Sequence, residues 1–171
     1  MIGDLLDLTR AQFAGSISLA RRPMDLQEVC DEAMTEIRAG HPDAVVRLHA
    51  SGDLRGEWDP DRLAQVVSNL VGNAIQHGSA TPVTVTAQEQ RDSVTFSVHN
   101  GGAPIPPDIM VVVFEPLTRG AAEGSSSSIG LGLFIARAIV SAHRGRIAVS
   151  SSARAGTTFS VELPKALPAR I

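Results

Sequence analysis

The polar residues with the clearest spacing for chemistry lie on one predicted helix, over residues 59–77. Asn69 and Asn73 are four residues apart and therefore share a face of that helix. At about 100° per residue, one polar stripe borders the apolar one and consists of Arg62, Gln65, Asn69, Asn73 and Gln76. Amides without a carboxylate suit an anionic ligand, because an amide oxygen can hold a metal ion while tolerating a nearby phosphate. A solvated helix edge is the alternative interpretation of this stripe.

A second candidate residue ends a predicted strand over residues 93–99. The alternation of that strand places its three apolar residues on one face, so Asn100 continues that face and His99 points the other way. Asn100 is therefore expected at the floor of any pocket between sheet and helices, where its amide could pair with a purine edge. The following Gly101-Gly102 would let another molecule approach the backbone closely. An Asn-Gly hairpin turn is the alternative interpretation.

A third group, Gly130-Leu131-Gly132-Leu133, leads directly into a predicted helix that ends near His143. Glycines ahead of a helix expose backbone N–H donors where the helix dipole favours an anion, so this turn could bind phosphate. A Gly-x-Gly turn on its own is weak evidence for such a site. Upstream, residues 121–128 are small and polar, which indicates either a mobile lid or a dispensable insertion.

The elements that must position these groups are predicted from hydrophobic periodicity. Helical spacing marks residues 1–13, 25–39, 59–77 and 130–143, and residues 14–24 are predicted to be a linker. Short or alternating segments predict strands at 45–50, 55–58, 82–88, 93–99, 146–151 and 157–163. Most of these strands have one apolar and one polar face. The predicted fold class is therefore α+β, a two-layer α/β sandwich of a mixed, mostly antiparallel sheet with helices on one face.

Composition limits the classes of protein to which the chain can belong. Its 171 residues, 43% of them hydrophobic, suffice for one domain with a core that needs no metal or disulfide. A formal net charge of −3 argues against a nucleic-acid-binding protein. The single cysteine, Cys30, excludes an internal disulfide, and the single lysine, Lys165, excludes a buried catalytic lysine from the folded body. No apolar run reaches the roughly 18 residues of a membrane span.

The order of the three groups resembles the ATP-binding catalytic domain of sensor histidine kinases, within the superfamily of gyrase, chaperone, kinase and mismatch-repair ATPases. Residues 61–74 are similar to the N box of that family, and residues 100–106 to its first glycine box. Phe114-Glu-Pro-Leu is similar to the F box, and residues 130–133 to the second glycine box. The resemblance runs from about Leu26 to Pro164 and implies the Bergerat ATP-binding fold.

The same resemblance implies a division of the chain. Residues 25–165 would form the ATP-binding catalytic domain. Residues 1–24 would be the end of a dimerisation helix and its linker, and residues 166–171 a C-terminal tail. Implied partners are the protein's own dimerisation and phosphoacceptor domain, a response-regulator receiver domain and, in the full-length protein, a second copy, but no nucleic acid. A cytoplasmic location is expected, including that of the cytoplasmic part of a membrane-anchored sensor.

The resemblance also implies ATP and Mg²⁺ as ligands, with particular residues holding them. Asn69 and Asn73 would bind the metal and the phosphates and serve catalysis, and Asn100 would bind the adenine amino group. Arg119, in a lid at 115–129, would lie near the phosphates. The other residues expected to contact the nucleotide are Gln76, His77, Gly102, Pro104, Ile105, Phe114, Gly130, Leu131, Gly132 and Leu133.

Three residues depart from the family pattern. Asn100 stands where the family usually has an aspartate that binds adenine, so its amide oxygen would accept the same hydrogen bond without a charge. Gln76 replaces a basic residue that is common after the N box, and Pro104 replaces the second glycine of the first glycine box. None of these changes removes the pocket, but together they leave the nucleotide affinity open.

Two absences bear on the reaction. The gyrase and chaperone branches carry a glutamate that activates water where this chain has Asn69, so transfer to a protein nucleophile is favoured over hydrolysis. None of the chain's five histidines is followed by an acidic residue, unlike the family's phosphoacceptor, so the acceptor is expected on a separate dimerisation domain. Two alternatives remain: a Ser/Thr kinase of the anti-sigma-factor type, and a degenerate nucleotide-binding or protein-binding module.

Overall fold

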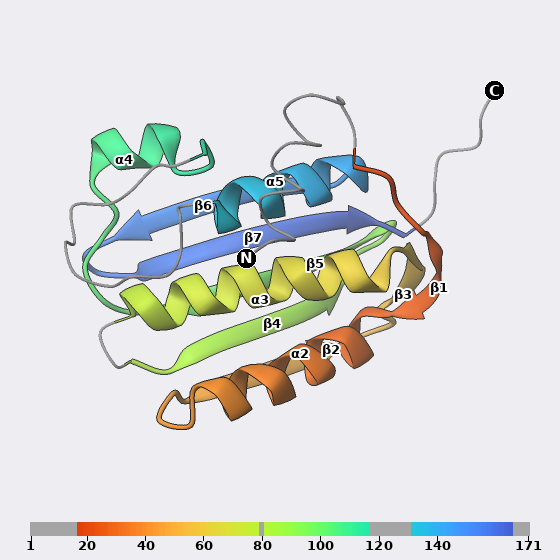
Figure 1. Cartoon of the computed structure of the whole chain (residues 1–171), viewed down its shortest axis with the longest axis horizontal. Coiled ribbons are helices and arrows are strands. Elements are labelled where there is room, and N and C mark those ends of the chain that lie inside the picture. Colours follow the sequence, from red (N-terminus) through yellow and green to blue (C-terminus); the bar gives the residue numbers. More distant parts are fainter. Residues whose placement is uncertain (1–16, 79–80, 117–130, 166–171) are drawn as a thin grey trace.

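A five-stranded sheet forms one layer of the structure, and helices cover one of its faces (Figure 1). The computed structural model describes residues 17–78, 81–116 and 131–165. In spatial order the strands are β2 (Val46–Ser51), β4 (Val83–Glu89), β5 (Ser93–Asn100), β7 (Gly156–Pro164) and β6 (Arg146–Ser152). β2 pairs with β4 in parallel, and the other neighbouring strands pair antiparallel. The predicted mixed, mostly antiparallel sheet and two-layer fold are confirmed.

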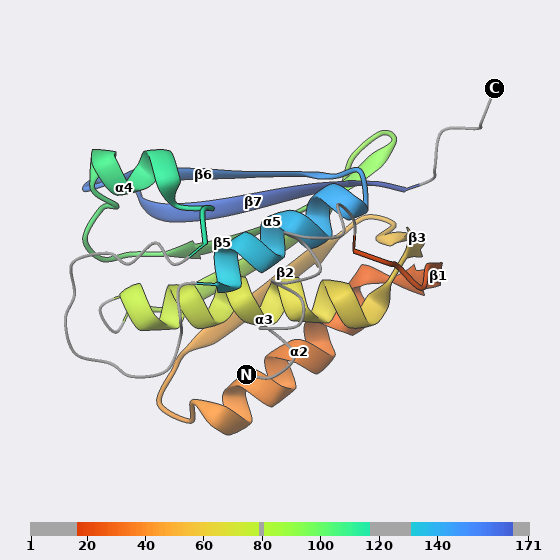
Figure 2. The ribbon, with the colours of Figure 1, turned by 45° about the horizontal axis from the view of Figure 1, so that its top comes forward.

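The helical layer is built around α3 (Pro60–His77), which packs against α2 (Leu26–Gly40) on one side and α5 (Gly132–Ala142) on the other (Figures 1 and 2). Its buried side chains recur at helical spacing and are Pro60, Leu63, Val66, Val67, Leu70, Val71 and Ala74. The Asp59 side chain accepts the N–H of Arg62 and caps the start of this helix. The sequence therefore fixes both where α3 begins and which face it buries.

The core lies between the helices and the inner face of the sheet. β5 and β7 alternate as predicted, and their inward side chains have no exposure; these are Val94, Phe96, Val98, Phe159, Val161 and Leu163. The buried Phe96 and Phe159 make the centre of the sheet sensitive to truncation, since replacing a buried phenylalanine by alanine costs about 3–5 kcal/mol. This packed core fixes the position of the end of β5 relative to the end of α3.

The structure corrects the predicted linker at 14–24. Residues Arg22–Asp25 form strand β1, which pairs antiparallel with β3 (Arg55–Trp58) in a separate two-stranded sheet. Ile17 is buried, and the N–H of Ala20 donates to Asp59 Oδ2 at 2.8 Å. The segment from Ile17 onward therefore packs on the domain. A partner strand more than thirty residues away leaves no local pattern from which this pairing could be read.

One further helix was not predicted: α4 (Pro107–Val112). None of its residues is buried, so it shows no apolar stripe, and Pro106 and Pro107 at its start suggested an irregular turn. The predicted helical segment 1–13, most of the predicted lid and the tail 166–171 lie outside the described residues. In the part of the chain that is described, no helix combines the length and apolar character needed to cross a bilayer.

Candidate functional site

Asn69 lies where α3 meets the beginning of α5. Its side-chain nitrogen donates to the backbone carbonyl of Gly132 at 3.1 Å. A Cβ built on Gly132 would lie 3.5 Å from Asn69 Cγ, so the two helices are in close contact at this point. With the amide nitrogen directed at Gly132, Oδ1 is the acceptor that Asn69 can offer to a ligand. Asn73, one turn further along α3, is half-buried.

Asn100 ends β5 on the inner face of the sheet, as its parity predicted. It is 2% exposed, whereas His99 is half-buried on the other face and pairs its Nδ1 with the Thr158 hydroxyl at 2.9 Å. The amide nitrogen of Asn100 donates to the carbonyl of Gly101 at 2.6 Å. This contact commits Nδ2, so Oδ1 is the group able to accept a hydrogen bond. A buried amide with an available acceptor is the arrangement expected of a site that binds an amino group.

The end of α3 approaches Asn100 from the helical layer. A Cβ on Gly78, the residue after α3, would lie 3.3 Å from the Cβ of Asn100. Beyond Asn100, Gly102 has φ 104°, a left-handed conformation that side chains disfavour. Gly156 faces Asn100 from the next strand, and a Cβ there would lie 2.4 Å from the Asn100 carbonyl oxygen. The structure thus brings both predicted asparagine motifs to the same end of the two layers.

The F-box residue and the start of α5 complete the arrangement. Phe114 is half-buried and packs edge-on against Phe159, with ring centroids 6.0 Å apart. Glu115 forms an ion pair with Arg137 of α5, with Oε1 and Nη1 3.2 Å apart. α5 begins at Gly132, two residues later than the predicted start, and Leu131 gives it no side-chain cap. The first residue of the predicted lid, Glu115, is therefore joined to α5.

The remaining predicted site residues differ in their positions. Leu131 is buried, Ile105 and Leu133 are half-buried, and Pro104 is exposed. Gln76 and His77 are exposed on the last turn of α3. Arg119 and Gly130 lie outside the described residues.

Two polar residues that the sequence analysis missed, Thr157 and Ser151, lie in line with Asn100 across the neighbouring strands. Thr157 on β7 is opposite Asn100 in the strand register and is 5% exposed. Its hydroxyl lies 2.7 Å from that of Ser151 on β6, which also accepts the N–H of Ile105 at 2.9 Å. The signal was available, because Thr157 shares the inward parity of Phe159 and Val161 and is thus a polar residue on an apolar face.

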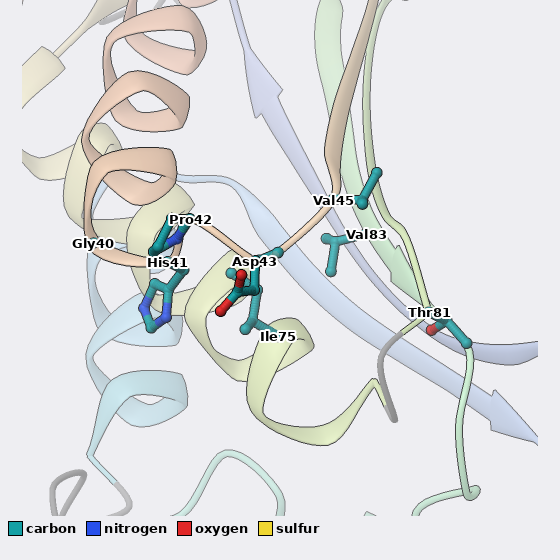
Figure 3. Close-up of a pocket in the computed structure, with 9 residues that line it drawn as sticks. Gly40, His41, Pro42, Asp43, Val45, Ile75, Thr81 and Val83 are labelled. Carbon is teal, nitrogen blue, oxygen red and sulfur yellow. The ribbon is translucent and has the colours of Figure 1, made fainter.

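A pocket lies elsewhere, between the end of α2 and the start of β4 (Figure 3). It has a volume of about 350 Å³, and its walls include His41, Asp43, Ile75 and Thr81. Ile75 is more than 100° around α3 from both Asn69 and Asn73. None of the predicted nucleotide contacts lines this pocket.

A buried contact joins the start of α3 to the end of α5. His143 has no exposure; its Nε2 accepts the N–H of Asp59 at 3.0 Å, and its Nδ1 donates to the carbonyl of Ile139 at 2.9 Å. Burial lowers the pKa of His143 below its usual 6.5, and the neighbouring Arg21 lowers it further, against the opposing effects of Ile139 and Asp59. The neutral imidazole is therefore the form that fits this contact.

Comparison with known proteins identifies relatives over nearly the whole chain. The family model described as histidine kinase-, DNA gyrase B-, and HSP90-like ATPase matches residues 58–167. The bacteriophytochrome of Pseudomonas aeruginosa is 32% identical over 96% of this chain and 23% of its own length. The adaptive-response sensory kinase SasA of Synechococcus elongatus is 34% identical over 96% of this chain and 43% of its own length. The chain thus spans less than half of these relatives.

Solved structures of histidine kinases are also similar to this chain. The catalytic domain of histidine kinase ThkA superposes with a TM-score of 0.73 and 29% identity, covering 88% of this chain and 97% of that one. The full-length kinase ShkA, solved in complex with AMPPNP, superposes with a TM-score of 0.82 and 27% identity, covering 99% of this chain and 36% of that one. The similarity to the ThkA structure is therefore that of one whole domain to another.

Proposed function

This chain belongs to the histidine kinase-, DNA gyrase B- and HSP90-like ATPase family and is an ATP-binding catalytic domain of the sensor histidine kinase type, and we propose that it positions Mg-ATP for phosphoryl transfer to a histidine on a separate dimerisation domain. The observation that carries the proposal is the contact of Asn69 with Gly132 at 3.1 Å. This contact joins the asparagine face of α3 to the glycine turn that begins α5. Amide groups and backbone N–H donors there suit a polyphosphate.

Under this proposal the adenine binds beside Asn100. The buried Asn100 Oδ1 would accept a hydrogen bond from the adenine amino group, and the apolar side chains of Ile105 and Leu131 would border the base. The phosphates would lie toward Asn69, Asn73 and the start of α5. Arg119, in the lid, is proposed to lie near the phosphates.

Magnesium fits the chemistry of the available donors. Asn69 and Asn73 offer neutral amide oxygens, and Mg²⁺ commonly takes only a few protein oxygens together with phosphate oxygens and water. Within residues 17–78, 81–116 and 131–165, no group of three or more histidine, cysteine, aspartate or glutamate residues could hold a metal ion. The proposed metal site therefore depends on the nucleotide as well as on the protein. The bound ion would neutralise charge on the phosphates.

Transfer to a protein nucleophile is proposed in preference to hydrolysis. The only acidic residue of α3 is Asp61, which lies in the first turn, two turns before Asn69. No carboxylate of this helix is then available beside the phosphates as a general base for water. What remains for the protein is to position the nucleotide and stabilise charge, which is the main task in phosphoryl transfer.

The proposed partners are a dimerisation domain with the phosphoacceptor histidine and a response-regulator receiver domain, and the proposed location is the cytoplasm. The test is incubation with γ-labelled Mg-ATP and a supplied dimerisation domain of a histidine kinase. Acid-labile, base-stable label on that domain is expected, and it should be lost with Asn73→Ala. Acid-stable label would favour the Ser/Thr kinase alternative, and steady release of inorganic phosphate by the chain alone would contradict the absence of a base.

A further inference from the structure

The loop that follows Asn100 is fixed near both ends by hydroxyl groups from other elements. The N–H of Gly101 donates to Thr81 Oγ1 at 3.0 Å, and the N–H of Ile105 donates to Ser151 Oγ at 2.9 Å. We propose that Thr81 and Ser151 are positioning residues that give Asn100 its preference for adenine over guanine, an inference that rests on the proposed function. Their hydroxyl groups hold the loop after Asn100, and the Gly101 carbonyl in that loop orients the Asn100 amide.

An asparagine at this position has a problem that an aspartate does not have. The two ends of a carboxylate are equivalent acceptors, but the amide of Asn100 has one acceptor and one donor end. Rotated by 180° about its terminal bond, the amide would present Nδ2, which matches the carbonyl of guanine instead of the amino group of adenine. Selectivity for adenine therefore requires that one orientation of the amide be fixed.

The Gly101 carbonyl supplies that constraint. It accepts a hydrogen bond from Asn100 Nδ2 at 2.6 Å, which selects the orientation with Oδ1 as the free acceptor. The orientation of the Asn100 amide is therefore fixed only as firmly as the position of Gly101. Because Gly101 and Gly102 have no side chains, the backbone here has more freedom than elsewhere, and a bound nucleotide would have to order it if the protein did not.

Thr81 fixes Gly101 from the helical layer. Its hydroxyl lies 2.5 Å from the carbonyl of Gly78, directly after α3, and donates to that oxygen. The lone pairs of the same hydroxyl remain to accept the N–H of Gly101. The fit is close, since a Cβ on Gly101 would lie 3.0 Å from Thr81 Oγ1 and Cγ2. The position of Gly101 is thus tied to the end of the helix that carries Asn69 and Asn73.

Ser151 fixes the other end of the loop from the sheet. It is half-buried on β6, while its neighbours Ser150 and Ser152 are exposed. Its hydroxyl lies 2.7 Å from that of Thr157, which is itself opposite Asn100 in the β5–β7 register. Asn100, Thr157 and Ser151 therefore form one polar row across three strands, and the N–H of Ile105 is held at the far end of that row.

The test compares the affinities of Mg-ADP and Mg-GDP, measured by calorimetry, for the intact chain and four variants. Ser151→Ala and Thr81→Val each remove one hydroxyl. Ser150→Ala is the matched control on the exposed neighbour of Ser151, and Thr81→Ser keeps the hydroxyl that Thr81→Val removes. The unfolding midpoint and the amide exchange of Gly101 and Ile105 are measured on the same samples, so that a variant with a disordered fold is recognised.

Loss of one hydrogen bond should weaken ADP binding by about three- to tenfold in Ser151→Ala and Thr81→Val. GDP binding should weaken less, so the ratio of the two affinities falls, while Ser150→Ala and Thr81→Ser stay close to the unmodified chain. An unchanged ADP affinity, or an equal loss for ADP and GDP, would overturn the inference and leave both residues with a structural role. If the unmodified chain itself binds no nucleotide, the proposed function fails instead.

Discussion

Asp59 joins three parts of the domain, and its replacement tests how firmly the N-terminal segment is held. Asp59→Ala removes the acceptor for the Arg62 N–H at 3.1 Å and the acceptor for the Ala20 N–H at 2.8 Å. Loss of a helix N-cap costs about 1 kcal/mol, and loss of a buried hydrogen bond to a charged acceptor about 1.5–3 kcal/mol. Since Asp59 is 5% exposed, we expect the free energy of unfolding to fall by about 2.5–4 kcal/mol.

The assay is urea denaturation, combined with limited digestion by trypsin. Asp61→Ala is the matched control, because Asp61 is also acidic and in the first turn of α3 but is exposed. The control should lose no more than about 0.5 kcal/mol. In Asp59→Ala, cleavage after Arg21 should become faster, because the Ala20 contact no longer holds the chain. Equal losses of stability in the two variants would refute the assignment of Asp59 as a junction.

Three further predictions concern stability and reactivity. Because burial lowers the pKa of His143 below 6.5, the contribution of its neutral form to stability should be complete above pH 6.5 and decline as the pH falls below that value. Urea midpoints measured between pH 7.5 and 5.5 test this expectation. A His143→Gln variant should lose that part of the pH dependence. Gly156→Ala should destabilise the fold by at least about 1 kcal/mol, because φ is 72° and the added Cβ would lie 2.4 Å from the Asn100 carbonyl oxygen. Gly40→Ala, whose added Cβ would have no atom within 4 Å, should be tolerated. Equal unfolding midpoints for the two variants would contradict this. Burial raises the pKa of the Cys30 thiol to about 12, so an aromatic disulfide reagent at pH 8 should react only after unfolding, and rapid labelling of the native chain would show that α2 opens.

The two central elements of the site were predictable because their signals are local. The apolar stripe of α3 and its cap at Asp59 predict the observed helix to within a residue at each end. Alternation along β5 correctly places Asn100 inward and His99 outward, since the two-residue period of a strand leaves no other choice. The family resemblance followed from the order of the motifs and the α+β fold class from the one-sided strands, and both are confirmed.

The features that the sequence analysis missed either depend on residues far away in the sequence or carry no periodic pattern. β1 pairs with β3, whose residues come thirty or more positions later in the sequence, and residues 22–25 alone carry no alternation. α4 buries nothing, so no periodicity marks it. The inward parity of Thr157 could have been read from the sequence, but its position opposite Asn100 and beside Ser151 depends on strand neighbours that only the structure shows. The contacts assigned to Arg119 and Gly130, which lie outside the described residues, stay predictions.

The central claim is that Mg-ATP binds between α3 and the end of β5, and calorimetric titration tests it most directly. The chain is titrated with ADP and with a non-hydrolysable ATP analogue, each with and without Mg²⁺, beside Asn100→Ala and the outward-facing control His99→Ala. The account predicts binding that Mg²⁺ strengthens, that Asn100→Ala loses and that His99→Ala keeps. No binding at millimolar nucleotide, or equal binding by both variants, would contradict it.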